Sequence, residues 1–443
     1  MTRLPPGPRF GLLQTVRYIS NPYAMLRAVA AQYGDIFSIR TGRAVVMTGK
    51  AALIRRIISA PAEQYGLIKE TGSKRIFGES GMTNLEGRAL RRDRKLMLPS
   101  FQGAALTGLG PMMRDAAMET VSGWTPGQVF TMRDTALSIA LDVILRTVFG
   151  ADTPQQRDDF REAVRRFSEA FGNKAFLLLA AFQFQNDGWP PYRNLAAARD
   201  DLEKLLQGAI DRARAAVAAG AQRTDILGLL VAARYEDGTG LSDAALRDNL
   251  VTTLLAGHET SVVSLCWAMF WLHRDPACLD RVMTELNTVG PDATPAQYAA
   301  LPYLDAVVKE TLRLWPVVPD INRVLAMPME LGGWDLPKGA VVAGCAAILH
   351  YDPELYPEPD RFRPERFLER RFAAHEYIPF GGGERMCPGA QFSSFELKII
   401  LATLLSRGRF TLLDPAPPPM KRVGFLMAPK SGVPMRYDGP RAG

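Results

Sequence analysis

The sequence predicts a mainly helical protein with a smaller β-rich region. Long stretches repeat apolar residues at helical spacing, and the clearest are 111–217, the run from Ser242 and the run after Cys387. Short segments of alternating apolar residues indicate strands near 35–50, 323–347 and 408–437. The length of 443 residues allows two or three domains, but the chain has no internal repeat and no low-complexity linker.

Composition and charge indicate an ordinary globular protein and argue against nucleic-acid binding. With 47% hydrophobic and 22% charged residues, the chain has the composition of an ordinary globular protein. Its four cysteines form no disulfide framework and indicate a reducing compartment, so we expect a cytoplasmic protein. No signal segment and no membrane-spanning stretch of roughly 18 apolar residues is present, so we expect no membrane anchor. The net charge is +7, but the basic residues are scattered, so nucleic acid is not the expected partner.

The N-terminal elements are short. Helices are predicted over Pro22–Tyr33 and Ala51–Ile58. Two strands, Ile36–Arg40 and Ala44–Thr48, flank a glycine-containing turn and indicate a hairpin. Residues 66–86 mix glycine, polar and single apolar side chains, which predicts a loop, and a basic helix follows from Gly87 to Leu96.

The middle of the chain reads as helices. The segment Phe171–Trp189 is rich in aromatic residues, and a buried core helix explains it about as well as a functional role. A long helix is expected to begin near Ser242, a good N-cap, and it contains the run Ala256–Thr260. Gly257 inside this helix costs about 1 kcal/mol relative to alanine, so it requires a reason. Close packing is one reason, and room for a ligand is another.

Cys387 is the residue with the clearest chemical signal. It follows three consecutive glycines, which permit a tight turn, and precedes Pro388, which suits the first position of a helix. A helix N-terminus favours an anion, and a thiolate binds metals. Zinc or an iron–sulfur cluster needs several nearby thiolates or imidazoles, but no other Cys or His lies between residues 377 and 397. One thiolate suffices for haem; a small buried cysteine is the plainer alternative.

The chain resembles the cytochrome P450 family, the haem-thiolate monooxygenases. Five positions match the family pattern F-x-x-G-x-R-x-C-x-G: Phe380, Gly383, Arg385, Cys387 and Gly389. Further family motifs follow in the expected order: A-G-x-E/D-T at Ala256–Thr260, E-x-x-R at Glu310–Arg313 and P-E-R-F at Pro364–Phe367. The resemblance implies one domain over 1–443 with the cytochrome P450 fold and heme b, iron protoporphyrin IX, as cofactor.

The resemblance also implies roles for individual residues. Cys387 would ligate iron, and Arg94, Arg323 and Arg385 would bind the haem propionates. Leu90 stands where the family has an aromatic hydrogen-bond donor, so one propionate contact is missing. The other positions expected to contact the cofactor are Phe380, Gly389, Ala256 and Gly257. Glu310, Arg313 and Arg366 would form a buried ion network that holds the cysteine loop.

The expected reaction is monooxygenation. Glu259 and Thr260 would supply an acid and a hydroxyl for proton delivery to dioxygen. The expected substrate is a hydrophobic small molecule, such as a terpenoid, steroid or fatty acid, which is hydroxylated or epoxidised. Its pocket would be lined by Ile76, Phe77, Met82, Leu255, Val317, Val318 and Phe425.

Other functions compete with this one. A haem-thiolate peroxygenase or isomerase would use peroxide, and a haem sensor would not be an enzyme; neither needs the Glu259–Thr260 pair. A helical protein without haem is the last alternative. Because only residues 388–443 follow Cys387, we expect electrons from a separate ferredoxin or flavodoxin with its reductase. The positive charge would attract such an acidic partner, and we expect a monomer.

Overall fold

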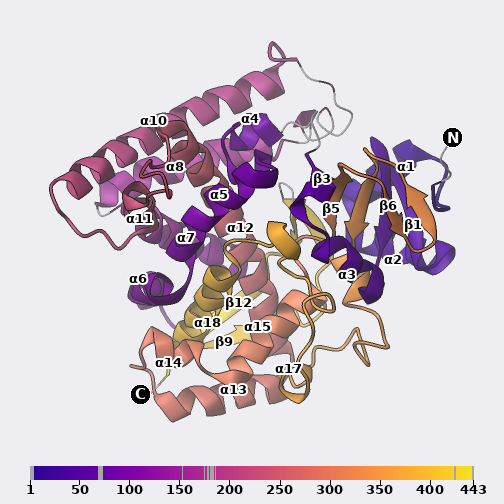
Figure 1. Cartoon of the computed structure of the whole chain (residues 1–443). Coiled ribbons are helices and arrows are strands. Elements are labelled where there is room, and N and C mark those ends of the chain that lie inside the picture. Colours follow the sequence, from indigo (N-terminus) through magenta and orange to yellow (C-terminus); the bar gives the residue numbers. More distant parts are fainter. Residues whose placement is uncertain are drawn as a thin grey trace.

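The computed structural model describes residues 4–67, 73–151, 153–173, 175–176, 179, 184, 186–423 and 426–441. They form a mainly helical body beside a smaller β-rich part (Figure 1). The longer helices are α1 (Gly11–Ser20), α2 (Pro22–Tyr33), α3 (Ala51–Ser59), α5 (Gly87–Met97), α6 (Gly103–Ser122), α7 (Met132–Thr147), α8 (Pro154–Phe171), α10 (Pro190–Ala218), α12 (Asp243–Arg274), α13 (Pro276–Val289), α15 (Pro302–Leu314) and α18 (Ala390–Arg407). The shorter helices are α4 (Ser73–Phe77), α11 (Ile226–Ala232), α14 (Pro295–Ala299), α16 (Ala346–Leu349) and α17 (Arg366–Glu369), with 3-10 turns η1 (Ala62–Gln64), η2 (Met82–Asn84), η3 (Leu98–Phe101) and η4 (Gly383–Arg385).

The largest sheet has the strand order β1-β2-β8-β5-β3. Its strands are β1 (Ile36–Thr41), β2 (Arg43–Thr48), β3 (Tyr65–Gly66), β5 (Ile321–Leu325) and β8 (Val341–Gly344). The β1–β2 and β5–β8 pairs are antiparallel, and β2 pairs with β8 in parallel. A three-stranded sheet joins β4 (Val129–Thr131), β12 (Pro434–Pro440) and β9 (Gly408–Leu412), and two hairpins pair β6 (Met329–Leu331) with β7 (Trp334–Leu336) and β10 (Met420–Val423) with β11 (Leu426–Pro429).

The helix α12 runs through the centre of the helical body (Figure 1). It is buried along most of its length because it carries apolar side chains on several faces, and Trp267 and Phe270 are among its fully buried residues. It shares one large apolar core with α6, α7, α15 and α18. Within the described ranges, no helix has the length and apolar content that crossing a membrane requires.

Several predicted elements are confirmed. The helix Pro22–Tyr33 has the predicted bounds, and the predicted hairpin is β1–β2, with Ile36 opposite Thr48. The predicted start of the central helix is also correct, since the Ser242 hydroxyl accepts from the N–H of Ala245 (3.2 Å).

Other predictions were wrong in detail. The predicted loop 66–86 contains α4 and η2, because side chains of α12 hold this segment in place. The Asp248 carboxylate accepts from the N–H of Ser80 (2.9 Å), and the Asn249 amide oxygen accepts from the N–H of Met82 (2.9 Å). The helix after the cysteine begins at Ala390, so Pro388 lies in the preceding turn and not at its first position.

The bounds of some strands differ from the predicted bounds. In the stretch 323–347, which was predicted to contain strands, β8 ends at Gly344 and the chain continues as α16. Another strand of this stretch, β5, begins earlier, at Ile321, and ends at Leu325. Much of the aromatic segment 171–189, together with Gly424 and Phe425, lies outside the described residues.

Candidate functional site

Cys387 lies in the turn between η4 and α18. Its N–H donates to the carbonyl oxygen of Phe380 (2.9 Å), and its own carbonyl oxygen accepts from the N–H of Ala390 (3.3 Å). The side chain is exposed, whereas the other three cysteines are buried. Desolvation by the surrounding protein nevertheless raises the pKa of this thiol, and the Gly389 N–H and Arg94 only partly oppose it. The helix N-terminus therefore does not make a thiolate by itself, and a bound metal would have to displace the proton.

Three arginine side chains gather near Cys387 from three elements. Arg94 lies on α5, Arg323 on β5 and Arg385 in η4. Desolvation lowers the pKa of all three guanidinium groups. The pKa of Arg323 falls to about 10, because the positive charge of Arg385 adds to the desolvation. The positive charge of Arg94 likewise lowers the pKa of Arg385. No carboxylate of a described residue makes an ion pair with any of them. The site therefore holds an excess of buried positive charge, which a doubly anionic ligand would neutralise.

Carbonyl oxygens orient two of these guanidinium groups. Arg385 donates to the carbonyl of Leu85 (2.6 Å), and Arg323 donates to that of Gly382 (3.3 Å). Leu85 ends the segment held by α12, so this segment, the cysteine loop and the sheet meet at the arginines. Sequence analysis did not anticipate the contact with Leu85, because it joins positions 300 residues apart.

Leu90 occupies the place where a hydrogen-bond donor was expected. It is 3% exposed and lines a cavity of about 20 Å³ that Arg323 and Arg385 also line. Tyr65 borders the same cavity, but its hydroxyl donates to the carbonyl of Ile57 (2.6 Å). Among the residues that line this cavity, Arg323 and Arg385 are therefore the side chains that could donate hydrogen bonds to an anion.

The run Ala256–Thr260 occupies the middle of α12. Gly257 faces α7, where an added Cβ would stand 2.7 Å from the end of the Ile144 side chain, so a larger residue would make that side chain shift. Ala256, one residue earlier, is exposed. The Thr260 hydroxyl donates to the Ala256 carbonyl (2.5 Å), and the buried His258 ring contacts the Leu254 carbonyl (2.6 Å), as expected for a packed helix residue.

Glu259 faces a cavity of about 590 Å³ between α7, α8, α12 and the β10–β11 hairpin. Desolvation raises the pKa of its carboxyl, and the charge of Arg133, which lines the same cavity, opposes that shift. A carboxyl with a raised pKa keeps its proton to a higher pH than a solvated carboxyl does, which suits a group that passes on protons. The same cavity has apolar walls that include Leu137, Val263 and Leu426.

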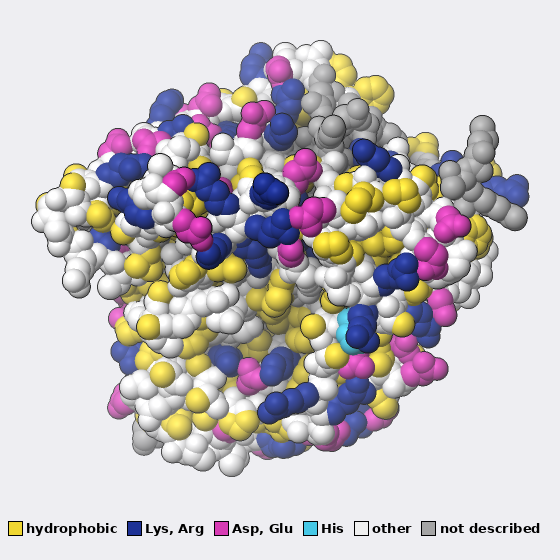
Figure 2. Space-filling view, in the orientation of Figure 1, with side chains coloured by type: hydrophobic (Ala, Val, Ile, Leu, Met, Phe, Trp, Pro, Cys, Tyr) yellow, Lys and Arg dark blue, Asp and Glu magenta, His cyan; other side chains and the backbone are white. Residues whose placement is uncertain are grey.

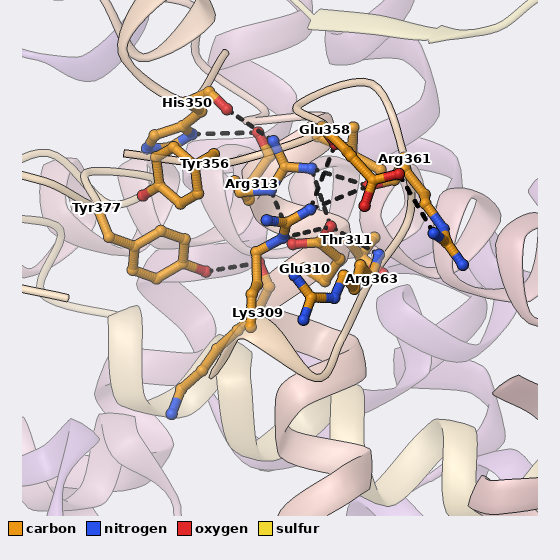
Figure 3. Close-up of polar contacts among 12 residues, drawn as sticks. Lys309, Glu310, Thr311, Arg313, His350, Tyr356, Glu358, Arg361, Arg363 and Tyr377 are labelled. Atoms are coloured by element: carbon orange, nitrogen blue, oxygen red, sulfur yellow. Dashed lines mark hydrogen bonds and ion pairs between the residues drawn. The ribbon is translucent and has the colours of Figure 1, made fainter. Parts of the chain in front are cut away.

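The predicted ion network is present and fully buried (Figure 3). Arg313 donates to both carboxylate oxygens of Glu310, at 2.7 and 2.8 Å, and Arg366 donates to one of them at 3.1 Å. The N–H of Arg363 gives Glu310 a fourth donor (2.8 Å). The three charged residues are 0%, 0% and 3% exposed, so Glu310 offsets one of the two guanidinium charges without solvent. Backbone carbonyl oxygens accept the remaining hydrogen bonds of Arg366.

His350 connects this network to the segment that precedes the cysteine loop (Figure 3). The N–H of Ile378 donates to its Nε2 (3.0 Å), so the ring proton must lie on Nδ1, which donates to the carbonyl of Arg313 (3.1 Å). Desolvation, together with the charge of Arg313, lowers the pKa of His350 to about 3. The neutral His350 ring therefore links the backbone of Arg313 to that of Ile378 by two hydrogen bonds, a role that sequence analysis did not identify.

Glu396 is a second buried carboxyl that sequence analysis did not identify. It lies on α18, is 0% exposed, and one oxygen is 2.5 Å from the hydroxyl of Ser261 on α12. Its other oxygen has no hydrogen-bond partner among the described residues. Desolvation raises the pKa of Glu396 to about 8. The signal in the sequence was a glutamate between two apolar residues, Phe395 and Leu397, at the start of the apolar-periodic run of this helix.

The predicted pocket residues lie in different surroundings. Ile76 and Met82 are buried in the main core, and Phe77, Leu255 and Val317 pack against it. Val318 is 47% exposed, and Phe425 lies outside the described residues. The pocket therefore remains a prediction.

The basic helix α5 lies on a face where both signs of charge occur. Its cations pair with acidic side chains of other segments: Arg91 with Glu63 and Glu384, Arg92 with Asp237, and Lys95 with Glu236. Figure 2 shows Lys and Arg among Asp and Glu on this face, without one continuous basic patch. Electrostatic attraction of an acidic partner here is weaker than the sequence suggests.

The residues at Cys387 fit a haem group. An exposed thiol could bind the iron, and the three arginines without carboxylate partners could bind two propionates. The exposed Ala256 in the middle of α12 leaves room on that helix for a bound group.

Comparisons with known proteins agree with this fit. Residues 2–434 match the family described as Cytochrome P450. Cytochrome P450 135B1 of Mycobacterium tuberculosis is 32% identical, with 99% of this chain and 92% of the relative covered. Cytochrome P450 137 of the same organism is also 32% identical, with coverage of 98% and 91%. A solved structure of cyanobacterial CYP120A1 with bound retinoic acid is 25% identical and superposes with a TM-score of 0.84, covering 99% of this chain and 100% of that one.

Proposed function

The chain belongs to the cytochrome P450 family, a family of haem-thiolate monooxygenases, and on this basis we propose that it hydroxylates or epoxidises a hydrophobic small molecule. One observation carries the proposal: an exposed cysteine thiol lies near three arginines that make no ion pair with a carboxylate of the described residues. Haem, when bound, supplies the activation of dioxygen for insertion of one oxygen atom into a C–H bond.

Each residue of the site has a separate task in this proposal. Cys387 ligates the iron as a thiolate, and Arg94, Arg323 and Arg385 neutralise the propionates. Phe380 holds the Cys387 N–H through its carbonyl, and Gly389 directs its own N–H toward the sulfur. Glu310, Arg313 and Arg366 keep the preceding segment in place through His350.

We further propose that Glu259 delivers protons from the 590 Å³ cavity on the outer side of α12. Burial raises the pKa of its carboxyl, so the protonated form is favoured more than in a solvated glutamate. Thr260 follows in the chain, and its hydroxyl donates to Ala256, which leaves the oxygen free to accept a hydrogen bond. The pair can therefore move a proton along α12 toward the exposed Ala256.

The substrate class is proposed on physical grounds. Ile76, Phe77, Met82, Leu255 and Val317 offer apolar surface, which suits a terpenoid, steroid or fatty acid. The similar cyanobacterial structure contains retinoic acid, which is consistent with a hydrophobic substrate. Electrons are proposed to come from a ferredoxin or flavodoxin with its reductase.

A Cys387→Ala variant tests the iron ligand. Haem-loaded protein should show the strongly red-shifted Soret band of a thiolate-ligated ferrous carbon monoxide complex, and the variant should lose that band. Cys278→Ala is the matched control, because Cys278 is buried elsewhere and should leave the spectrum unchanged. An unchanged spectrum in Cys387→Ala would exclude the proposed ligand.

Glu259→Gln and Thr260→Val test the proton path. With NAD(P)H, ferredoxin and reductase, each substitution should lower product formation by about 100-fold, the usual size of an acid–base contribution. Peroxide-supported turnover should change far less, because peroxide brings its own protons. Equal losses with both oxidants would contradict the proton-delivery role.

A further inference from the structure

The helix α1 is inverted relative to an ordinary surface helix. Its two buried side chains, Gln14 and Thr15, are polar and only 3% and 2% exposed. Three of its large apolar side chains point outward instead, with exposed fractions of 67% for Leu12, 49% for Leu13 and 49% for Val16, and Phe10 just before the helix is 78% exposed. Tyr18 and Ile19, nearer its C-terminal end, are half-buried. A surface helix normally buries its apolar side, so this arrangement needs an explanation.

Polar contacts at both ends hold α1 in this orientation. The Gln14 side chain donates to the carbonyl of Pro8 (2.8 Å) and accepts from the N–H of Arg40 on β1 (2.7 Å). At the other end, Tyr18 donates to the carboxylate of Asp320 (2.6 Å), and Arg422 donates to the carbonyl of Tyr18 (3.1 Å). Rotating the helix to bury its leucines would break these contacts, so the apolar side stays exposed.

Exposed arginines surround the apolar residues. Arg9 precedes the helix, Arg17 lies in its last turn, and Arg40 lies on the adjoining strand β1. No carboxylate of a described residue pairs with any of the three, unlike the cations of α5. Apolar side chains flanked by unpaired arginines are typical of a helix that lies in the headgroup region of a membrane.

We propose that α1 docks this protein on the surface of a lipid bilayer that contains anionic lipids. Phe10, Leu12, Leu13 and Val16 enter the boundary of the acyl chains, while Arg9, Arg17 and Arg40 contact the lipid phosphates. The helix lies on the bilayer and does not cross it. In Figure 1, α1 lies at the outer edge of the β-rich part.

A second copy of the chain is a poorer occupant of this surface. In a two-fold dimer the same patch of both copies pairs, so the three arginines of each copy would enter one interface together. Like charges at short distance repel, whereas lipid phosphates attract them. Charge complementarity therefore favours the anionic bilayer.

The test is co-sedimentation of the haem-loaded full chain with vesicles of phosphatidylcholine alone or mixed with phosphatidylglycerol. We expect binding to the mixed vesicles that weakens with added salt. A Leu12→Gln/Leu13→Gln variant should bind at least about 10-fold more weakly, since burial of even one leucine is worth about that factor. Leu413→Gln is the matched control, because Leu413 is 42% exposed and lies outside α1; it should bind like the parent.

A second variant tests the charges separately. Arg9→Gln/Arg17→Gln should weaken binding about 10-fold or more and reduce its salt dependence. The proposal is overturned if the parent does not bind mixed vesicles, if both double variants bind as well as the parent, or if light scattering shows a dimer that Leu12→Gln/Leu13→Gln abolishes. Unchanged Soret spectra would verify that each variant is folded.

Discussion

Two buried glutamates of this protein are stabilised in opposite ways. Glu310 and Glu396 are both 0% exposed, and both lie on helices of the main core. Glu310 receives four hydrogen bonds, from two guanidinium groups and one backbone N–H. Glu396 contacts one hydroxyl, and one of its oxygens has no partner among the described residues. The first is therefore suited to a charged carboxylate and the second to a neutral acid.

Hydrogen-bond counting supports the neutral form of Glu396. The Ser261 hydroxyl has a single proton, yet its oxygen lies near two acceptors, the Gly257 carbonyl (3.1 Å) and Glu396 (2.5 Å). Both contacts are hydrogen bonds only when Glu396 is protonated and donates to Ser261. The comparison teaches that burial alone does not decide the charge of a carboxyl; the donors around it do.

The largest expected effect is at Glu310. Glu310→Gln leaves Arg313 and Arg366 buried without an anion, so we expect the free energy of unfolding to fall by about 3–5 kcal/mol. Urea unfolding of the haem-loaded protein measures it. Glu369→Gln is the control: its partner Arg363 is near the surface, and a loss below about 1 kcal/mol is expected. Similar losses in both variants would contradict the role of the network.

At Glu396 we expect a pH dependence. Its pKa of about 8 in the folded protein exceeds the ordinary 4.5, so between these values unfolding releases a proton. The free energy of unfolding should therefore fall as pH rises through this range, by about 1.4 kcal/mol for each pH unit. Glu396→Gln should lack this slope and gain stability relative to the parent as pH rises. Parallel pH curves for the two proteins would show that Glu396 does not titrate there.

His350 should produce the opposite slope on the acid side. Its pKa of about 3 lies below the ordinary 6.5, so unfolding takes up a proton between these values. The free energy of unfolding should fall as pH drops below about 6.5, by about 1.4 kcal/mol for each pH unit. The effect can be assigned to His350 only above about pH 5, because carboxylates titrate below that pH. His350→Gln, which can still donate and accept, should lack this acid loss. If His350→Gln lost stability toward acid pH as steeply as the parent, the loss would belong to other titrating groups.

The smallest expected effect is at Ser261. Ser261→Ala removes one hydrogen bond and should cost about 1 kcal/mol. When Glu396 is charged, the Ser261 hydroxyl donates to its carboxylate and lowers its pKa, so the loss of Ser261 should raise that pKa and extend the pH slope to higher pH. Ser264→Ala is the control, since Ser264 donates to the Thr260 carbonyl (3.0 Å) and does not contact Glu396 in the described structure. A slope that ends at the same pH in both variants would contradict the assignment.

The sequence predicted the parts of the site that depend on near neighbours. The loop around Cys387 is defined within ten positions, and Glu310 meets Arg313 because three residues separate them on one helix. Contacts between distant segments were harder to predict. Ser261 meets Glu396 across 135 positions, and Gly257 faces Ile144 of another helix. The sequence analysis did not predict helix α1. Its apolar residues face solvent and its buried residues are polar, which is the reverse of the pattern by which a surface helix is recognised in a sequence.

By itself the sequence determined the family and the order of the motifs, because these depend on residue identity and short spacing. Only the tertiary structure decided which buried groups carry charge, since desolvation and the number of nearby donors depend on how helices pack. It also decided that the apolar side of α1 faces outward, because polar contacts with Pro8, Arg40 and Asp320 hold it there.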